Sequence, residues 1–117
     1  MTRAAQVGID IFLIFDGLND IRNCETAAAA ALRAGKKVEG NIQFTSSPVH
    51  SIESFVQTAK EYVAIGATAV HLEDMGGMID PITARDTVAA VKRAVDVPVH
   101  YHSHCTGGMT EITYWEV

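Results

Sequence analysis

Strand-like and helix-like segments alternate along the whole chain, and this alternation limits its fold more than any other feature. Short apolar runs rich in β-branched residues indicate buried strands, and each is followed by a longer segment with helical periodicity. The runs that we expect to be strands cover residues 9–16, 37–44, 67–74 and 97–102. Because strands separated by single helices pair in parallel through right-handed crossovers, the sequence predicts one parallel sheet.

The segments between these runs carry helix start and stop signals. Helices are expected at residues 21–34, 51–65 and 81–95, and a further helix begins shortly before Val117. Pro81 suits the first turn of a helix, and Gly35 and Gly66 stand where a left-handed residue often ends one. The chain therefore consists of four βα units.

Two architectures accept four βα units: a small open sheet flanked by helices, and part of a (βα)8 barrel. A full barrel usually needs about 250 residues, so this chain supplies about half of one. Barrel enzymes place their sites at the carboxyl ends of the strands. Polar residues gather at these ends here, namely Asp16, Asn19, Thr45, Glu73, Asp74, His102 and His104. We therefore predict an α/β fold in which residues 1–117 form a single domain, half of a TIM barrel completed by oligomerisation.

Composition argues against some classes of binding partner and cellular location. The formal net charge is −5 and no basic run is longer than a pair such as Lys36 and Lys37, which argues against a nucleic-acid partner or an anionic membrane. No apolar run approaches the roughly 20 residues of a membrane helix, and the first residues lack a signal-peptide core. We expect a cytoplasmic protein with no membrane insertion. Cys24 and Cys105 follow no Cys-x-x-Cys spacing and are expected to be free thiols.

Three histidines at alternate positions of the last predicted strand are the strongest functional signal. Side chains alternate between the two faces of a strand, so His100, His102 and His104 point the same way. Imidazoles two residues apart lie about 7 Å apart at Cα, close enough to converge on one divalent ion. The alternative is a polar strand end whose histidines make local hydrogen bonds. His50 and His71 are expected to be surface or packing residues.

Four motifs in order resemble the carboxyltransferase barrel of biotin-dependent enzymes. They are residues 8–20 (GIDIFLIFDGLND), 47–50 (SPVH), 73–77 (EDMGG) and 102–108 (HSHCTGG). The family includes the oxaloacetate decarboxylase alpha subunit, the transcarboxylase pyruvate-binding subunit and pyruvate carboxylase, and the pattern is more distantly similar to metal-dependent lyases and synthases of the same superfamily.

The resemblance implies one divalent ion, Zn, Mn or Co, at the mouth of the barrel, where it polarises the carbonyl of a 2-oxo acid. It assigns His102 and His104 as ligands of this metal, and we expect His100, one pleat deeper, to be a core-facing histidine that orients them. Asp74 is either an acceptor that orients a ligating histidine or a cap of the following loop. Asp16 and Thr45 are our candidates for substrate contacts. Biotin would be supplied by a partner and is not bound covalently here.

The sequence departs from the family pattern at two positions. Glu73 stands where the family has a carboxylated lysine that binds the metal, so Glu73 is either a replacement ligand or a solvated carboxylate. Leu13 stands where the family usually has an arginine, and we expect it to be an ordinary core side chain. The family's remaining metal ligand, an aspartate on the first barrel strand, has no counterpart in these residues.

These departures favour a fragment-like homologue with a residual divalent-metal site and little independent catalysis. The alternative is a metal-dependent 2-oxo acid decarboxylase or carboxyltransferase, acting on oxaloacetate or pyruvate, that is active as an oligomer or with a partner chain carrying the rest of the barrel. Four parallel strands with helices on one side leave an open face, which is an association hazard unless something covers it. We therefore expect self-association.

Overall fold

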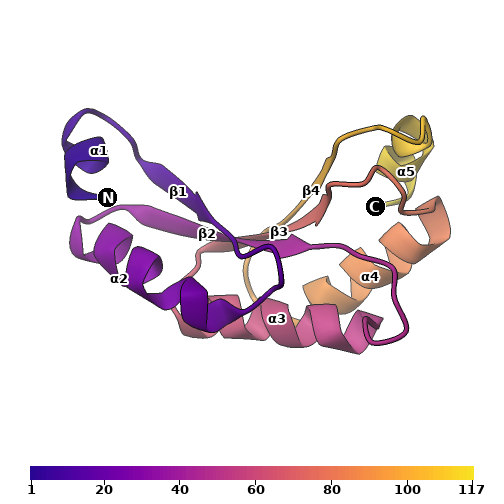
Figure 1. Ribbon diagram of the computed structural model, residues 1–117, viewed down its shortest axis with the longest axis horizontal. Helices are drawn as coiled ribbons and strands as arrows, with labels where there is room; N and C mark the ends of the chain where they lie inside the picture. The colour runs from indigo at the N-terminus through magenta and orange to yellow at the C-terminus, as the bar shows by residue number, and fades with distance from the viewer.

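The computed structural model describes residues 1–117 and contains one parallel sheet in the strand order β1-β2-β3-β4 (Figure 1). The strands are β1 (Ile11–Ile14), β2 (Lys37–Gln43), β3 (Ala69–Asp74) and β4 (Val99–Ser103). The helices are α1 (Thr2–Gln6), the 3-10 turn η1 (Ile21–Asn23), α2 (Glu25–Arg33), α3 (Ile52–Ala64), α4 (Pro81–Ala94) and α5 (Thr110–Glu116). The prediction of four βα units in parallel is confirmed. Each helix is too short or too polar to span a membrane.

The first unit differs most from the sequence prediction. The strand expected over residues 9–16 is only Ile11–Ile14, because the backbone N–H of Ile9 donates to the Ala4 carbonyl in α1 instead of joining the sheet. At the other end, the Asp16 carboxylate accepts the backbone N–H groups of Leu18 and Asp20, which turns the chain out of the sheet. The helix expected over residues 21–34 is divided into η1 and α2.

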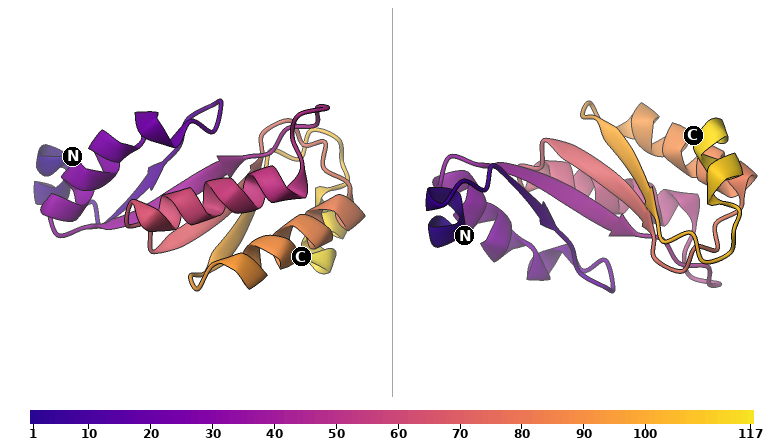
Figure 2. Two further views of the ribbon diagram at one scale, coloured as in Figure 1. Left: turned by 90° about the horizontal axis from the view of Figure 1, so that it is seen from below. Right: turned by 90° about the horizontal axis from the view of Figure 1, so that it is seen from above.

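Helices α2, α3 and α4 all cover one face of the sheet (Figures 1 and 2). Alternate residues of the strands pack against them, and the core includes Val38, Ile42, Val70 and Leu72. The ring of Tyr62 from α3 lies on Gly40 so closely that a Cβ at Gly40 would stand 2.2 Å from its Cγ. Only glycine permits this approach, which fixes α3 against the middle of β2.

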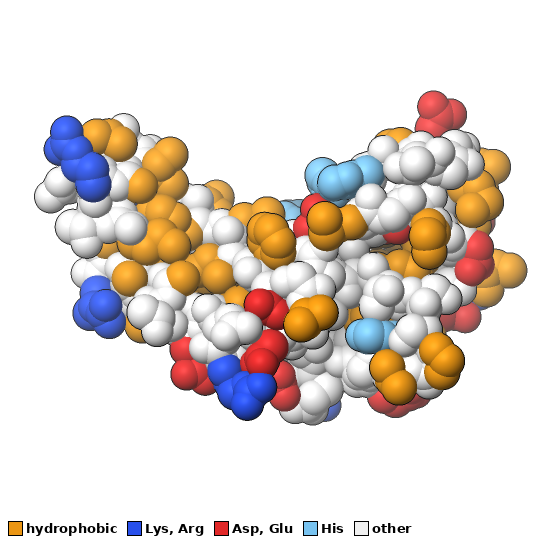
Figure 3. Space-filling view, viewed as in Figure 1, with side chains coloured by type: hydrophobic (Ala, Val, Ile, Leu, Met, Phe, Trp, Pro, Cys, Tyr) orange, Lys and Arg blue, Asp and Glu red, His pale blue; other side chains and the backbone are white.

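The other face of the sheet has no helix over it and is concave. Apolar side chains gather on this open face over β1, and histidines lie toward β4 (Figure 3). Leu13 belongs to the open face and is 49% exposed, so its prediction as an ordinary core side chain is wrong. The reason is the period of the strand: Phe12 and Ile14 turn toward the helices, so Leu13 must turn away from them.

Candidate metal centre

The register of β3 and β4 brings a carboxylate beside the histidine pair at the carboxyl end of the sheet. Glu73 is the Cα partner of His102, and His104 follows two residues later, just beyond the end of β4. Glu73 and His102 share the open face because they are cross-strand partners, and the His104 side chain joins them there. One ligand atom from each residue lies within 4.8 Å of the other two, so Glu73, His102 and His104 form a group that can hold a metal ion. We call these three residues the mouth group.

The two carboxylate–imidazole distances in the mouth group are close to those between ligands of a tetrahedral ion. Oε1 of Glu73 lies 3.4 Å from Nε2 of His104 and 3.6 Å from Nε2 of His102. Zinc–nitrogen bonds of about 2.0–2.1 Å at tetrahedral angles place neighbouring ligand atoms about 3.3 Å apart. The two imidazole rings meet edge to face, with centroids 5.3 Å apart. Three ligands at this spacing leave the fourth position open, as in catalytic zinc sites.

Two amide side chains of β2 orient the Glu73 carboxylate. Its Oε2 accepts hydrogen bonds from Nδ2 of Asn41 and, at 2.7 Å, from Nε2 of Gln43. With Oε2 occupied by these donors, Oε1 is the oxygen that faces the imidazoles. Asn41 is only 2% exposed, so its amide is held firmly between β2 and β3.

The same contacts determine the charge of Glu73. Burial by itself raises the pKa of this carboxyl, but hydrogen bonds from Gln43 and Asn41 and the neighbouring His102 and His104 outweigh it and hold the pKa below its usual value. Glu73 is therefore ionised at neutral pH, as a metal ligand must be.

The loops that follow β3 and β4 touch through glycines. The backbone N–H of Gly107 donates to the Gly77 carbonyl at 3.1 Å, and a Cβ at Gly77 would lie 2.3 Å from the backbone nitrogen of Thr106. The N–H of His104 also donates to the Asp74 carbonyl at 3.1 Å. These backbone contacts hold the loop that carries His104 against the end of β3, beside Glu73.

Asp74 caps the loop after β3. Its carboxylate accepts the backbone N–H groups of Met78 and Ile79, each at 3.0 Å, and no hydrogen bond joins it to an imidazole. Of the two roles considered for Asp74, the structure therefore matches the loop cap.

His100 lies one pleat away from His102 on the open face, where its ring stacks on that of His71 and is exposed, so its prediction as a core-facing histidine is wrong. No hydrogen bond joins the ring of His100 to His102 or His104. Its expected role in orienting these two ligands therefore rests on the sequence alone.

The two candidates for substrate contacts lie near β1 and β2. The Asp16 carboxylate is engaged by Leu18, Asp20 and Asn23, and these hydrogen bonds hold its pKa below the usual value. Thr45 lines a pocket of about 350 Å³ at the ends of β1 and β2, together with Asn19, Gln43, His50 and Met75. Because Gln43 also bonds Glu73, Thr45 lines a space next to the mouth group, whereas Asp16 is not part of this lining.

Sequence reasoning missed Asn41 and Gln43. Both lie in the predicted strand 37–44 at alternate positions, and the alternation of that strand would have placed them on one face. Their partner was not visible, because the pairing of β2 with β3 joins residues about thirty positions apart, Gln43 with Glu73. The side-chain oxygens Asn41 Oδ1 and Gln43 Oε1 are both buried without a hydrogen-bond partner, so each amide retains a free acceptor.

Comparison with known proteins identifies the family that the chain matches. A family model described as HMGL-like matches residues 7–111. The chain is 42% identical over 115 residues to a pyruvate carboxylase subunit of Methanocaldococcus jannaschii, a match that covers 98% of this chain and 20% of that protein. It is 37% identical over 113 residues to the methylmalonyl-CoA carboxyltransferase 5S subunit of Propionibacterium freudenreichii, with 95% and 22% covered.

Solved structures agree with these relatives. The carboxyl transferase domain of Rhizobium etli pyruvate carboxylase superposes with a TM-score of 0.94 at 29% identity, over 98% of this chain and 20% of that one. The same domain solved with pyruvate and biocytin gives a TM-score of 0.93 over 97% of this chain. The resemblance inferred from the four motifs is confirmed, and the four βα units correspond to part of that barrel. The chain spans about a fifth of the length of these relatives.

Proposed function

The chain belongs to the HMGL-like family, and from this membership we propose that it carries the divalent-metal site of a carboxyltransferase barrel that acts on 2-oxo acids. The observation that supports this most directly is the position of one ionised carboxylate, Glu73, at ligand spacing from two imidazoles, His102 and His104. The ligands would be these three residues, in agreement with the set expected from the sequence.

The donor set fits Zn, Mn or Co. Two imidazole nitrogens and one carboxylate oxygen suit a borderline divalent ion, and the open fourth position leaves room for a substrate oxygen. When bound, the ion would supply Lewis-acid polarisation of a 2-oxo acid carbonyl. The chain's own residues prepare the site: Asn41 and Gln43 fix the carboxylate, and the Gly77–Gly107 contact fixes the loop beside His104.

The proposed substrate class follows from the relatives. Structures of the Rhizobium etli domain were solved with pyruvate, 3-bromopyruvate and oxamate, each with a carboxylate next to a carbonyl group. We assign pyruvate or oxaloacetate as the substrate class of this site, with Thr45 in the pocket beside Gln43 as the substrate contact. Biotin would arrive on a partner, as a carboxyl carrier.

Turnover by this segment alone would be small, because the site is open to water. The side chain of His102 is 54% exposed, whereas only 13% of the Glu73 side chain is exposed. Carboxyl transfer requires exclusion of water, which the uncovered sheet face does not provide. We therefore propose metal binding as the retained property and efficient catalysis only in a completed barrel.

A second copy or a separate chain carrying further barrel strands would complete the barrel, and β1 favours such an assembly. Ile11, Leu13 and Phe15 expose apolar side chains in a row on the open face at the edge of the sheet. Sedimentation at micromolar concentration should show a dimer or larger species, and Ile11→Lys with Leu13→Lys should shift it toward monomer. A compact monomer of the unmodified chain would contradict self-association.

The metal proposal is tested by binding and by reaction. Purified chain should bind Co2+ or Zn2+ in titration calorimetry, and the metal-loaded chain should accelerate loss of oxaloacetate slightly above free metal. His102→Gln with His104→Gln should remove binding at the mouth group and this acceleration. His50→Gln is the matched control for metal binding, since His50 lies outside the group and bonds Ser47. Equal metal binding by the double variant and the unmodified chain would refute the proposed ligands.

A further inference from the structure

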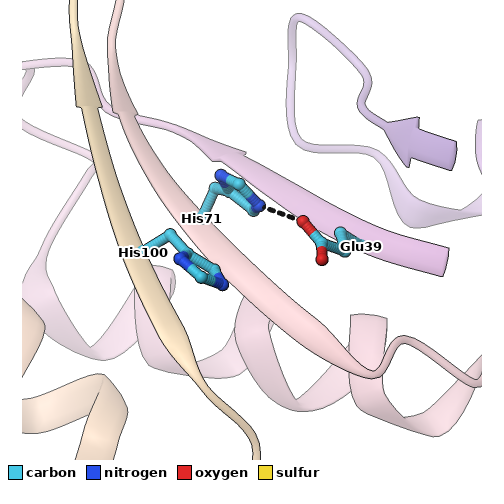
Figure 4. Close-up of side chains that lie close together, drawn as sticks. All are labelled: Glu39, His71 and His100. Atoms are coloured by element: carbon cyan, nitrogen blue, oxygen red, sulfur yellow. Dashed lines mark hydrogen bonds and ion pairs between the residues drawn. The ribbon is translucent and has the colours of Figure 1, made fainter. Parts of the chain in front are cut away.

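A second group of one carboxylate and two imidazoles lies on the open face, nearer the amino ends of the strands than the mouth group. Glu39 of β2, His71 of β3 and His100 of β4 each offer one ligand atom, and these atoms lie within 4.8 Å of one another. The three side chains converge from neighbouring strands (Figure 4). Four of the five histidines of the chain thus belong to two groups on one sheet face, and only His50 lies elsewhere.

Within this second group, Glu39 and His71 are in close contact, whereas His100 makes only a ring-stacking contact with His71. Nε2 of His71 lies 2.6 Å from Oε2 of Glu39, and the rings of His71 and His100 stack with centroids 4.7 Å apart and planes inclined by 30°. The side chains of Glu39 and His71 are largely shielded from solvent, and His100 is exposed on the open face. A tetrahedral ion spaces its ligand atoms about 3.3 Å apart, so the Glu39–His71 pair needs to open by only about 0.7 Å to admit one.

The ion pair between Glu39 and His71 leaves polar atoms of His100 and Asn41 without hydrogen-bond partners. The ring nitrogens of His100 have no hydrogen-bond partner in the protein, although one of them lies within reach of Glu39 and His71. Asn41 is the Cα partner of His71 on the same face, and its buried Oδ1 has no partner either. A buried polar atom without a partner is unfavourable, so a ligand or its bound water would be stabilised next to His71.

We propose that Glu39, His71 and His100 form a second site for a divalent transition-metal ion, with Zn2+ as the preferred occupant. Two imidazoles and one carboxylate are the ligand set of several zinc sites with an open fourth position. An ion here joins β2, β3 and β4 through one ligand from each strand. This site is independent of the function proposed above, since it uses none of the three ligands of the mouth group.

The spacing between the groups makes them two separate sites. Positions 71 and 73 on β3, and 100 and 102 on β4, are two residues apart, which is about 6.6 Å along a strand. Metal ions that share a substrate oxygen stand about 3.5–4 Å apart. The second ion therefore does not take part in a bridged pair, and its effect is to hold the three strands together.

The experiment is a Zn2+ titration of the full chain by calorimetry, with bound zinc measured by elemental analysis after gel filtration. We expect two equivalents for the unmodified chain and for His50→Gln. One equivalent is expected for His102→Gln with His104→Gln, and one for His71→Gln with His100→Gln. The variant with all four substitutions should bind none. Glu39→Gln keeps the shape of the side chain and should weaken binding at the second site by tenfold or more and binding at the mouth group by less, with the fold checked by circular dichroism.

The outcomes separate this site from the mouth group. If the His102/His104 variant still binds one equivalent and the His71/His100 variant binds none, the second site stands and the metal proposal at the mouth fails. If the His102/His104 variant binds no zinc, or the His71/His100 variant binds as much zinc as the unmodified chain, Glu39 and His71 form an ion pair only and the second site is refuted.

Discussion

The two groups on the open face contain the same residue types but differ in geometry. In the mouth group, Glu73 stands 3.4 Å and 3.6 Å from the two imidazoles, whereas Glu39 in the second group is drawn to 2.6 Å from His71. Glu73 has its second oxygen held by Asn41 and Gln43, and Glu39 accepts no amide hydrogen bond. Glu73 therefore stays at metal-ligand distance from its imidazoles because Asn41 and Gln43 hold its second oxygen. Glu39 has no such donors and lies closer to the nearest imidazole.

The largest expected effect comes from removing the carboxylate of the mouth group. Glu73→Ala leaves two ligands and should weaken metal binding there by more than about 100-fold, beyond the 10- to 100-fold that loss of an outer partner causes. The measurement is a Co2+ titration in the background of His71→Gln and His100→Gln, where only the mouth group can bind. Glu61→Ala, on the exposed surface of α3, is the control. An affinity within threefold of the parent would show that Glu73 is not a ligand.

The second-largest effect tests whether the side-chain amides of Asn41 and Gln43 position Glu73. Asn41→Leu with Gln43→Met keeps side-chain volume but removes both donors to Glu73, and should weaken metal binding at the mouth group by about 10- to 100-fold. The same titration measures it, with thermal unfolding to confirm the fold. Gln57→Met is the control, because Gln57 bonds a carboxylate on the surface of α3. Unchanged affinity would mean that the strands alone position Glu73.

A smaller effect should link the two groups. Glu39→Gln removes one negative charge about 7 Å from the mouth group, where the attraction between a unit charge and a divalent ion in water is about 1.2 kcal/mol, or about sevenfold in affinity. We expect Co2+ binding at the mouth group to weaken by no more than this. Raising the salt concentration should reduce the difference further. A change of about thirtyfold or more would show that the groups act as one site.

The smallest effect concerns acid stability. The pKa of Glu73 lies below its usual value of 4.5 in the folded protein, so ionised Glu73 favours folding above about pH 4.5. This contribution is lost as the pH falls through the lowered pKa. Urea unfolding of metal-free protein should show a smaller loss of stability between pH 5 and about pH 3 for Glu73→Gln than for the unmodified chain. Glu111→Gln, in the first turn of α5, is the control, and a steeper loss for the Glu73 variant would contradict the lowered pKa.

Sequence reasoning was most informative where all the residues of a motif follow one another along a single predicted strand. His100 and His102 share a face because strand periodicity requires it, His104 continues this alternation just beyond β4, and the four apolar runs predicted all four strands. Sequence reasoning was least informative at Leu13. The apolar character of this residue suggested the core, but one face of the first strand is exposed. An apolar residue in a strand has two faces to choose from, and only the position of the helices decides which one is buried.

The roles of His71, Asn41 and Gln43 were beyond sequence reasoning for a related reason. Each belongs to a group only because β2, β3 and β4 pair in one register, and a shift by one residue would turn every side chain to the other face. That register depends on contacts distant in sequence, among them Tyr62 packed on Gly40 and Gly107 bonded to Gly77.

The sequence by itself determined the parallel βα architecture and the alternation of faces, since both follow from local periodicity. Only the tertiary structure decided that Glu73 meets His102 and His104 while Glu39 meets His71, because cross-strand distances are set by strand register and packing.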